Sequence, residues 1–191
     1  MASVSPGKLS AIDAFFLAYQ ERADLDMHLG AEVELEGDLG REALVEALRL
    51  AQQRWPALGC RARKDLLGGL SWGLQAPASE LLHVVDQPTG ALRNRRLHPF
   101  DEPNFRLSWR SVSPSVHHLA IQAHHSLCDG EGFVTMAQWL VEQAASLVGG
   151  GGAVPPEALV ASKTMRMSRN SGMRTSSSMP PWVVATPMRA A

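Results

Sequence analysis

The chain has 191 residues, enough for one domain of ordinary size or for a domain with an appended tail. A hydrophobic content of 45% allows a buried core, and a net charge of -1 gives no electrostatic basis for a nucleic-acid or anionic-membrane partner. The cysteines, Cys60 and Cys128, lack CxxC or zinc-type spacing, so we interpret them as reduced thiols.

Targeting signals are not evident near the N-terminus. The longest apolar stretch there, residues 11–19, is interrupted by Asp13 and is followed by no cleavage-type site, so we expect no signal peptide. No run approaches the roughly 20 apolar residues that a membrane span needs, so we expect no transmembrane segment. These observations predict a cytoplasmic protein.

The first predicted elements are a helix and a strand. Residues 11–20 carry apolar side chains on one helical face, with Ser10 as the expected N-cap. That face consists of Ile12, Phe15, Phe16 and Tyr19. Residues 28–37 alternate apolar side chains with glycine and glutamate, a pattern typical of a half-buried strand with one solvated face.

An amphipathic helix is predicted next, within residues 38–58, and Pro56 ends its pattern. Its apolar positions recur at steps of three and four, at Leu44, Ala47, Leu48, Ala51 and Trp55. Short strands are expected around residues 58–62, 70–74 and 81–85, separated by glycine and proline.

Residues 105–112 and 116–125 then predict a β-hairpin or two adjacent strands, and helical spacing returns from Phe133 to Leu147. The order of elements indicates an α/β fold, an α+β sandwich with a mixed or antiparallel sheet flanked by helices.

The character of the chain changes after Val148, which divides it into a predicted lobe, residues 1–148, and a tail, residues 149–191. The lobe carries 13 basic and 18 acidic residues, whereas the tail carries five basic residues and one acidic residue. The tail opens on four glycines, contains five of the eight methionines and shows no sustained apolar period, so we expect it to be flexible or disordered. Two interpretations stay open: a benign tail, or a noncognate C-terminus on a protein that stops short of its second half.

The stretch HHSLCDG, residues 124–130, is the candidate chemical site. Alternation along a strand puts His125 at the end of the apolar face and His124 on the opposite face. A partly desolvated histidine stays neutral near pH 7, as a general base requires. Three roles stay open for Asp129: a contact with His125, hydrogen bonds that fix the loop, or a pair with a buried cation. Gly130 is expected to allow a positive φ or a close approach of the next helix. A structural role for the histidine pair is equally consistent with these residues alone.

A metal site is the weaker interpretation of the same stretch. His124, His125 and Cys128 lack the distant ligands that a zinc site needs, so we expect no metal.

The same stretch resembles the HHxxxDG active-site motif of a superfamily. That superfamily joins chloramphenicol acetyltransferase, nonribosomal-peptide condensation domains and bacterial wax ester synthase/diacylglycerol acyltransferases. Residues 9–18 resemble the opening helix of its condensation-like members, and residues 27–58 resemble their first strand, first long helix and RHPAL segment, with Trp55 in place of histidine. Residues 100–110 resemble the strand before the motif, and the similarity extends from about Leu9 to Val148.

The resemblance implies a role for each residue of the motif. His125 would be the general base that takes a proton from a hydroxyl or amine acceptor, which then attacks an acyl thioester on coenzyme A or on an acyl or peptidyl carrier protein. Asp129 would shape the turn through an ion pair with Arg106, and Gly130 would leave room for the thioester arm of the donor. His124 would support the site from the side away from the substrate. No permanently bound cofactor is implied.

Members of this superfamily with a single chain have two lobes with the reaction tunnel between them, and this chain resembles only the first. The chloramphenicol-type members build their sites between subunits, so a second lobe or self-association would be needed to complete a cleft. Three hypotheses follow: an acyltransferase that is truncated; an inactive single lobe that binds a partner; and a dihydrolipoyl-type acyltransferase. The N-terminal similarity and the absence of a lipoyl domain count against the third.

Overall fold

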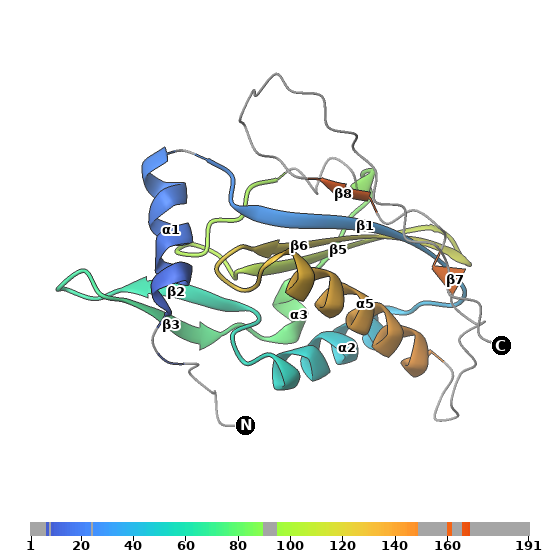
Figure 1. Cartoon of the computed structure of the whole chain (residues 1–191). Coiled ribbons are helices and arrows are strands. Elements are labelled where there is room, and N and C mark those ends of the chain that lie inside the picture. The colour runs from blue at the N-terminus through green and yellow to red at the C-terminus, as the bar shows by residue number, and fades with distance from the viewer. Residues whose placement is uncertain are drawn as a thin grey trace, which may run out of the picture.

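A computed structural model describes residues 7, 9–23, 25–89, 95–148, 160–161 and 166–168, the last two ranges by their backbone (Figure 1). Within the described residues, nine elements precede the last helix of the predicted lobe, and two short strands follow that helix. The helices are α1 (Ala11–Ala23), α2 (Arg41–Arg54), α3 (Ala78–Leu81) and α5 (Gly130–Leu147). The strands are β1 (His28–Glu36), β2 (Cys60–Lys64), β3 (Leu70–Gln75), β4 (Leu82–Val84), β5 (Phe105–Ser113), β6 (Val116–His124), β7 (Val160–Ala161) and β8 (Arg166–Ser168).

The main sheet is mixed, as the sequence predicts. Its strand order is β4-β5-β6-β1-β7, and β8 also pairs with β1. Strand β4 runs parallel to β5, whereas β5, β6 and β1 pair antiparallel in turn, so the predicted hairpin of residues 105–125 is confirmed. Strands β2 and β3 form a separate hairpin beside α1 (Figure 1).

Helices α2 and α5 cover one face of the main sheet, and α3 lies on the same side (Figure 1). The predicted apolar stripes of both long helices are buried there against Leu29, Ala31, Leu119 and Ile121 of the sheet. At the end of α2 the ring of Trp55 meets that of Trp139 edge to face at 5.2 Å, an arrangement favoured by the ring quadrupoles.

The opposite face of the sheet is polar. Because directly paired residues of antiparallel strands point to the same side, the register places His28 beside His124 and Glu34 beside His118 on this face. The carboxylate of Glu34 lies 2.8 Å from the imidazole Nε2 of His118. This agrees with the solvated face predicted for residues 28–37, although the half of β1 nearer His28 is buried.

Helix α1 is capped as predicted but presents its aromatic face to solvent. The Asp13 N–H donates to Ser10 Oγ at 3.2 Å, and the Ser10 N–H donates to the Asp13 carboxylate at 3.1 Å. The predicted apolar face remains 60% exposed at Ile12, 53% at Phe15 and 38% at Tyr19. A helix normally buries its apolar stripe against the core. In α1 tertiary contacts decide which side is buried, and the periodicity of the sequence does not encode those contacts.

The buried side of α1 is formed instead by Leu17 and Gln20. Leu17 packs with Cys60, Ala62 and Trp72 in a small second core that joins α1 to the β2–β3 hairpin. The first helix is therefore attached to the lobe through one apolar and one polar buried side chain.

Most of the tail predicted for residues 149–191 lies outside the described residues, and its predicted flexibility stays a prediction. The two short strands β7 and β8 pair with the outer edge of β1, which the sequence analysis did not anticipate. None of the described helices is long and apolar enough to cross a membrane.

The helix layer supplies a test of the core. We expect Leu48→Ala to lower the free energy of unfolding by about 2–5 kcal/mol, because Leu48 is fully buried between α2 and the sheet and its loss leaves a cavity. The matched control is Leu66→Ala, since Leu66 lies in a fully exposed loop and its truncation should stay within about 0.5 kcal/mol. Urea unfolding followed by circular dichroism measures both, and equal effects would contradict this core.

Candidate active site

The candidate site lies where β6 passes into α5. Strand β6 ends at His124, a turn spans residues 125–129, and α5 begins at Gly130. The turn is anchored from outside: the His125 N–H donates to the Met27 carbonyl at 2.8 Å, ahead of β1. The segment before β1 is thereby held beside the turn that follows β6.

Asp129 is the N-cap of α5. Its carboxylate accepts the Gly132 N–H at 2.8 Å, which satisfies one of the donors left without a partner at a helix start. A Cβ at Gly132 would lie 3.1 Å from that carboxylate and 3.2 Å from the Cβ of Cys128, so the cap favours glycine at this position.

Gly130 differs from the prediction made for it. It does not belong to the positive-φ glycines of the described chain, and a Cβ there would meet no atom within 4 Å. Neither a left-handed turn nor a close helix approach therefore requires glycine at this position. Its surroundings are open, as the role implied for the motif glycine would need.

The predicted ion pair between Arg106 and Asp129 is wrong. The guanidinium of Arg106 contacts the carboxylate of Glu102 and donates to Gln122 Oε1 at 3.2 Å. Arg106 stands opposite Gln122 in the β5–β6 register, on the polar face, whereas Asp129 lies beyond the turn at the helix start. Arg106 therefore fastens the segment before β5 onto the sheet and does not brace the motif turn.

His124 is buried and bonded through both ring nitrogens. Its Nδ1 accepts the Ser126 N–H at 3.1 Å and lies 2.7 Å from Ser126 Oγ, while its Nε2 lies 3.2 Å from Gln20 Oε1. Since Nδ1 accepts a backbone N–H, the hydrogen-bond pattern assigns the proton to Nε2, which donates to the Gln20 amide oxygen. This is the neutral imidazole, with no solvent contact.

The electrostatics support this assignment. Burial, followed by the neighbouring imidazoles of His125 and His28, lowers the pKa of His124 from 6.5 to about 3. His28 is its partner across β1 and β6 and is itself hydrogen-bonded to the carboxylate of Asp26. The first histidine of the motif is thus a structural group at neutral pH.

His125 has a different environment. It follows the strand rather than ending it, and its imidazole is half-buried and stacked on the Phe16 ring of α1, with centroids 5.0 Å apart and planes 23° apart. An aromatic face at this distance desolvates one side of the imidazole. The sequence analysis placed Phe16 in an apolar stripe and attached no role to Gln20, because contacts between α1 and the motif turn leave no local pattern.

Cys128 is a protonated thiol in this site. Burial, with the nearby Asp129 carboxylate, raises the pKa of Cys128 to about 12, so it carries almost no thiolate at neutral pH. Within the described residues, no three histidine, cysteine or acidic side chains are arranged to hold a metal ion.

Comparison with known proteins relates this fold to condensation domains. The chain has a TM-score of 0.63 to the starter condensation domain of rhizomide synthetase, at 18% identity, over 79% of this chain and 40% of that one. The first condensation domain of the calcium-dependent antibiotic synthetase, in complex with a substrate analogue, gives 0.59 at 21% identity over 81% of this chain and 42% of that one. Polyketide synthase associated protein 5 from Mycobacterium tuberculosis gives 0.61 at 18% identity over 81% and 36%.

In sequence, the chain is 30% identical over 125 residues to a nonribosomal peptide synthetase of Curvularia clavata, a match that covers 62% of this chain and 1% of the synthetase. No protein-family model matches the chain. The chain thus has the fold of a condensation-domain lobe and spans about 40% of the length of the first of these solved domains.

The cap of α5 can be tested by substitution. We expect Asp129→Ala to lower the free energy of unfolding by about 1 kcal/mol, because the Gly132 N–H loses its acceptor at the helix start. Asp129→Asn keeps a capping oxygen and should recover most of that loss. Urea unfolding of the three proteins measures the difference, and an alanine variant as stable as the parent would contradict the cap.

The burial of His124 predicts a pH dependence. The pKa of His124 is lowered in the folded state from 6.5 to about 3. Between these two pH values the unfolded chain binds a proton at His124 and the folded chain does not. As the pH falls through that window, His124 should lower the free energy of unfolding by up to about 1.4 kcal/mol per pH unit. Above pH 6.5 it should add no pH dependence. Proton NMR should show the His124 ring resonances unchanged between pH 7 and 5 and the Nε2–H tautomer retained. A midpoint near 6.5 would contradict the assignment.

Proposed function

We propose that this protein is an acyltransferase lobe in which His125 is the general base. The donor is an acyl thioester on coenzyme A or on an acyl or peptidyl carrier protein, and the acceptor is a hydroxyl or an amine. The fold shared with condensation domains supports this class of reaction, and the relative from Curvularia clavata is a nonribosomal peptide synthetase. No permanently bound cofactor is part of the proposal.

The observation that carries the proposal is the unequal environment of the two adjacent histidines. His124 is fully buried, with both ring nitrogens engaged by Ser126 and Gln20, so it cannot reach a substrate. His125 is half-buried at the open start of α5. Of this pair, His125 is therefore the residue able to exchange a proton with a bound acceptor.

The chemistry requires one neutral imidazole and no covalent intermediate. The His125 imidazole removes the proton from the acceptor oxygen or nitrogen while that atom forms a bond to the thioester carbonyl carbon. The carbon–sulfur bond then breaks, and the leaving thiolate takes the proton from the imidazolium. The stack on Phe16 holds the ring of His125 in a fixed orientation against α1. The raised pKa of Cys128 disfavours a thiol nucleophile in its place.

The other motif residues act on the position of His125. Asp129 fixes the start of α5, Gly130 leaves open space beside the turn, and His124 secures the end of β6 to α1. Arg106 contributes at a distance by holding the polar face of the sheet together. These are positioning residues, and the substrate-facing role falls to His125.

A complete cleft needs more surface than this lobe provides. Positioning, water exclusion and stabilisation of the developing oxyanion usually supply most of the rate enhancement of such an enzyme. We propose that a second lobe or a second copy of the chain supplies the opposite wall.

The alternative function is an inactive lobe that binds a partner. One observation favours it: the aromatic face of α1, with Ile12, Phe15 and Tyr19 exposed, adjoins the Phe16 ring that stacks on His125. Exposed apolar surface beside a motif turn is typical of a contact site. The two functions differ in whether thiol is released from a thioester.

The test is thiol release from acyl coenzyme A in the presence of an amine or alcohol acceptor. We expect His125→Ala to lower the rate by about 100-fold or more, because the proton acceptor is lost. His118→Ala is the matched control, since His118 is a partly exposed histidine of β6 that pairs with Glu34 far from the turn. The control should keep the parental rate, and circular dichroism should show that both variants are folded.

The outcomes separate the two functions. A His125→Ala variant with the parental rate would exclude this mechanism. A parental protein that is monomeric and silent with both coenzyme A and carrier-protein thioesters would favour the interaction lobe.

A further inference from the structure

The turn between β2 and β3 presents two adjacent leucines to solvent. Leu66 is 105% exposed and Leu67 is 97% exposed, the largest values among the large hydrophobic side chains of the described residues. Figure 1 shows the β2–β3 hairpin extending past α1, so that its turn stands away from the rest of the lobe. Nothing in the proposed acyl transfer uses this turn.

The turn has a defined conformation. The Asp65 N–H donates to the Gly69 carbonyl at 2.9 Å, and the Gly68 N–H donates to the Asp65 carbonyl at 3.1 Å. The Asp65 carboxylate accepts the N–H groups of Leu67 at 2.9 Å and of Gly69 at 2.7 Å. Gly68 has a φ of +83°, which favours glycine, and a Cβ at Gly69 would collide with the Asp65 carboxylate. A specific turn sequence therefore holds the two leucines at the apex of the hairpin.

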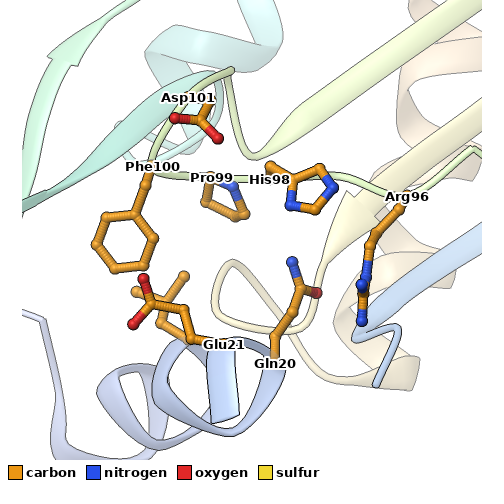
Figure 2. Close-up of a pocket in the computed structure, with 8 residues that line it drawn as sticks. Gln20, Glu21, Arg96, His98, Pro99, Phe100 and Asp101 are labelled. Carbon is orange, nitrogen blue, oxygen red and sulfur yellow. The ribbon is translucent and has the colours of Figure 1, made fainter. Parts of the chain in front are cut away.

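The opposite end of the hairpin is fixed to the lobe. Cys60, Ala62 and Trp72 belong to the second core, together with Leu17 of α1. The Ala62 N–H donates to the Pro99 carbonyl at 2.7 Å, in the segment that lies opposite α1 in Figure 2. Because the hairpin is anchored before it binds anything, a contact made at its apex loses little conformational entropy.

Basic side chains stand directly behind the apex. Lys64 and Arg63 occupy the last two paired positions of β2 before the turn. At about 3.3 Å per residue along a strand, both lie within roughly 10 Å of the leucines. Arg63 is exposed and forms no ion pair within the described part of the chain. The hairpin thus has an apolar tip with a cationic zone behind it.

Three carboxylates lie near the cations of the hairpin. Glu21 of α1 is 4.0 Å from Lys64 Nζ, and Glu80 of α3 is 3.8 Å from the Arg61 guanidinium. These four side chains are 43–59% exposed, and ion pairs between exposed groups are weak, so an anionic surface can compete for both cations. The third carboxylate, that of Asp65, is engaged by N–H groups of the turn.

The local charge of the hairpin differs from that of the whole chain. Residues 60–75 carry three basic side chains and one acidic side chain, whereas the chain as a whole has a net charge of -1. The whole-chain value gave no basis for an anionic-membrane partner because it averages over this distribution. Electrostatic attraction to a surface depends on the charges nearest to it, since salt screens those beyond about 10 Å.

The shape of the apex favours a lipid bilayer over a folded partner. Two leucines on a two-stranded turn form a narrow convex tip, and a protein would need a matching apolar pocket to receive it. The exposed aromatic face of α1 in a second copy is also convex, so it does not provide such a pocket. A bilayer needs no complementary shape, because apolar side chains enter its acyl region while basic side chains stay with the phosphate headgroups.

We propose that this hairpin is a membrane-contact arm. Leu66 and Leu67 enter the interface of a bilayer that contains anionic phospholipids, and Arg63 and Lys64 lie at the level of its headgroups. The contact is peripheral and involves none of the residues of the motif turn.

The test is co-sedimentation of the full chain with vesicles of two compositions: phosphatidylcholine alone, or equal parts of phosphatidylcholine and phosphatidylserine. We expect the mixed vesicles to bind the chain about 10-fold more tightly than phosphatidylcholine alone, because the basic side chains are attracted to anionic headgroups. Added salt should weaken binding to the mixed vesicles.

Variants assign the contact to the apex. The double substitution Leu66→Ser and Leu67→Ser should weaken binding to mixed vesicles about 10-fold or more, because both apolar side chains leave the interface. Arg63→Gln should weaken binding about 3-fold on mixed vesicles and leave binding to phosphatidylcholine unchanged. Leu74→Ser is the matched control, since Leu74 is an exposed leucine of β3 away from the turn. It should bind as the parent does, and circular dichroism should show that every variant is folded.

Two results would overturn the proposal: a parent that sediments with neither kind of vesicle, or a double variant that binds as tightly as the parent. Analytical ultracentrifugation tests the other occupant. A parental dimer that the double variant loses would assign the leucines to a contact between copies and would also overturn the proposal.

The arm and the acyl transfer are tested independently. His125→Ala should bind vesicles as the parent does, and loss of binding in that variant would contradict a contact at the hairpin apex. A chain that binds vesicles but releases no thiol would remove the proposed acyl transfer and leave the membrane contact standing.

Discussion

The contact between Gln20 and His124 is the constraint on which the arrangement of the site depends. A single amide oxygen receives the His124 imidazole and the Met27 N–H, while the amide nitrogen donates to the Leu97 carbonyl. This ties α1, the entry to β1, the end of β6 and the segment before β5 at one point. All four are separate in sequence, and each unmade bond in this buried place would cost about 1–3 kcal/mol. The position of α1 over the motif turn follows from it.

The same contact differentiates the two adjacent histidines. Together with Ser126 it engages both ring nitrogens of His124, which is a neutral structural group. Burial lowers the pKa of this ring to about 3. The turn after β6 then points His125 at Phe16 instead of continuing the strand alternation. A buried polar network is rigid when every member has its hydrogen-bond partners. The network around His124 therefore fixes the position of its half-buried neighbour His125.

The two faces of the main sheet differ in polarity. Helices cover one face of the main sheet, while the other face carries polar side chains such as those of His28, Gln122 and Arg106. The solved condensation domains that share this fold are longer, and this chain spans about 40% of the first of them. The exposed aromatic face of α1 lies away from its buried residues Leu17 and Gln20, so one helix both anchors the lobe and presents an apolar surface.

The sequence by itself determined the order of the long helices and of the main strands and the apolar stripes of α2 and α5, because periodicity and capping are local properties. It left the sheet as mixed or antiparallel and gave no signal for α3, β7 and β8. It also identified the motif turn and the Ser10 cap. Only the tertiary structure decided which side of α1 is buried, that Arg106 pairs with Glu102 rather than Asp129, and that Gly132 rather than Gly130 is crowded. Each of these depends on contacts between segments far apart in the chain, and no short-range pattern records which distant side chain fills a given space.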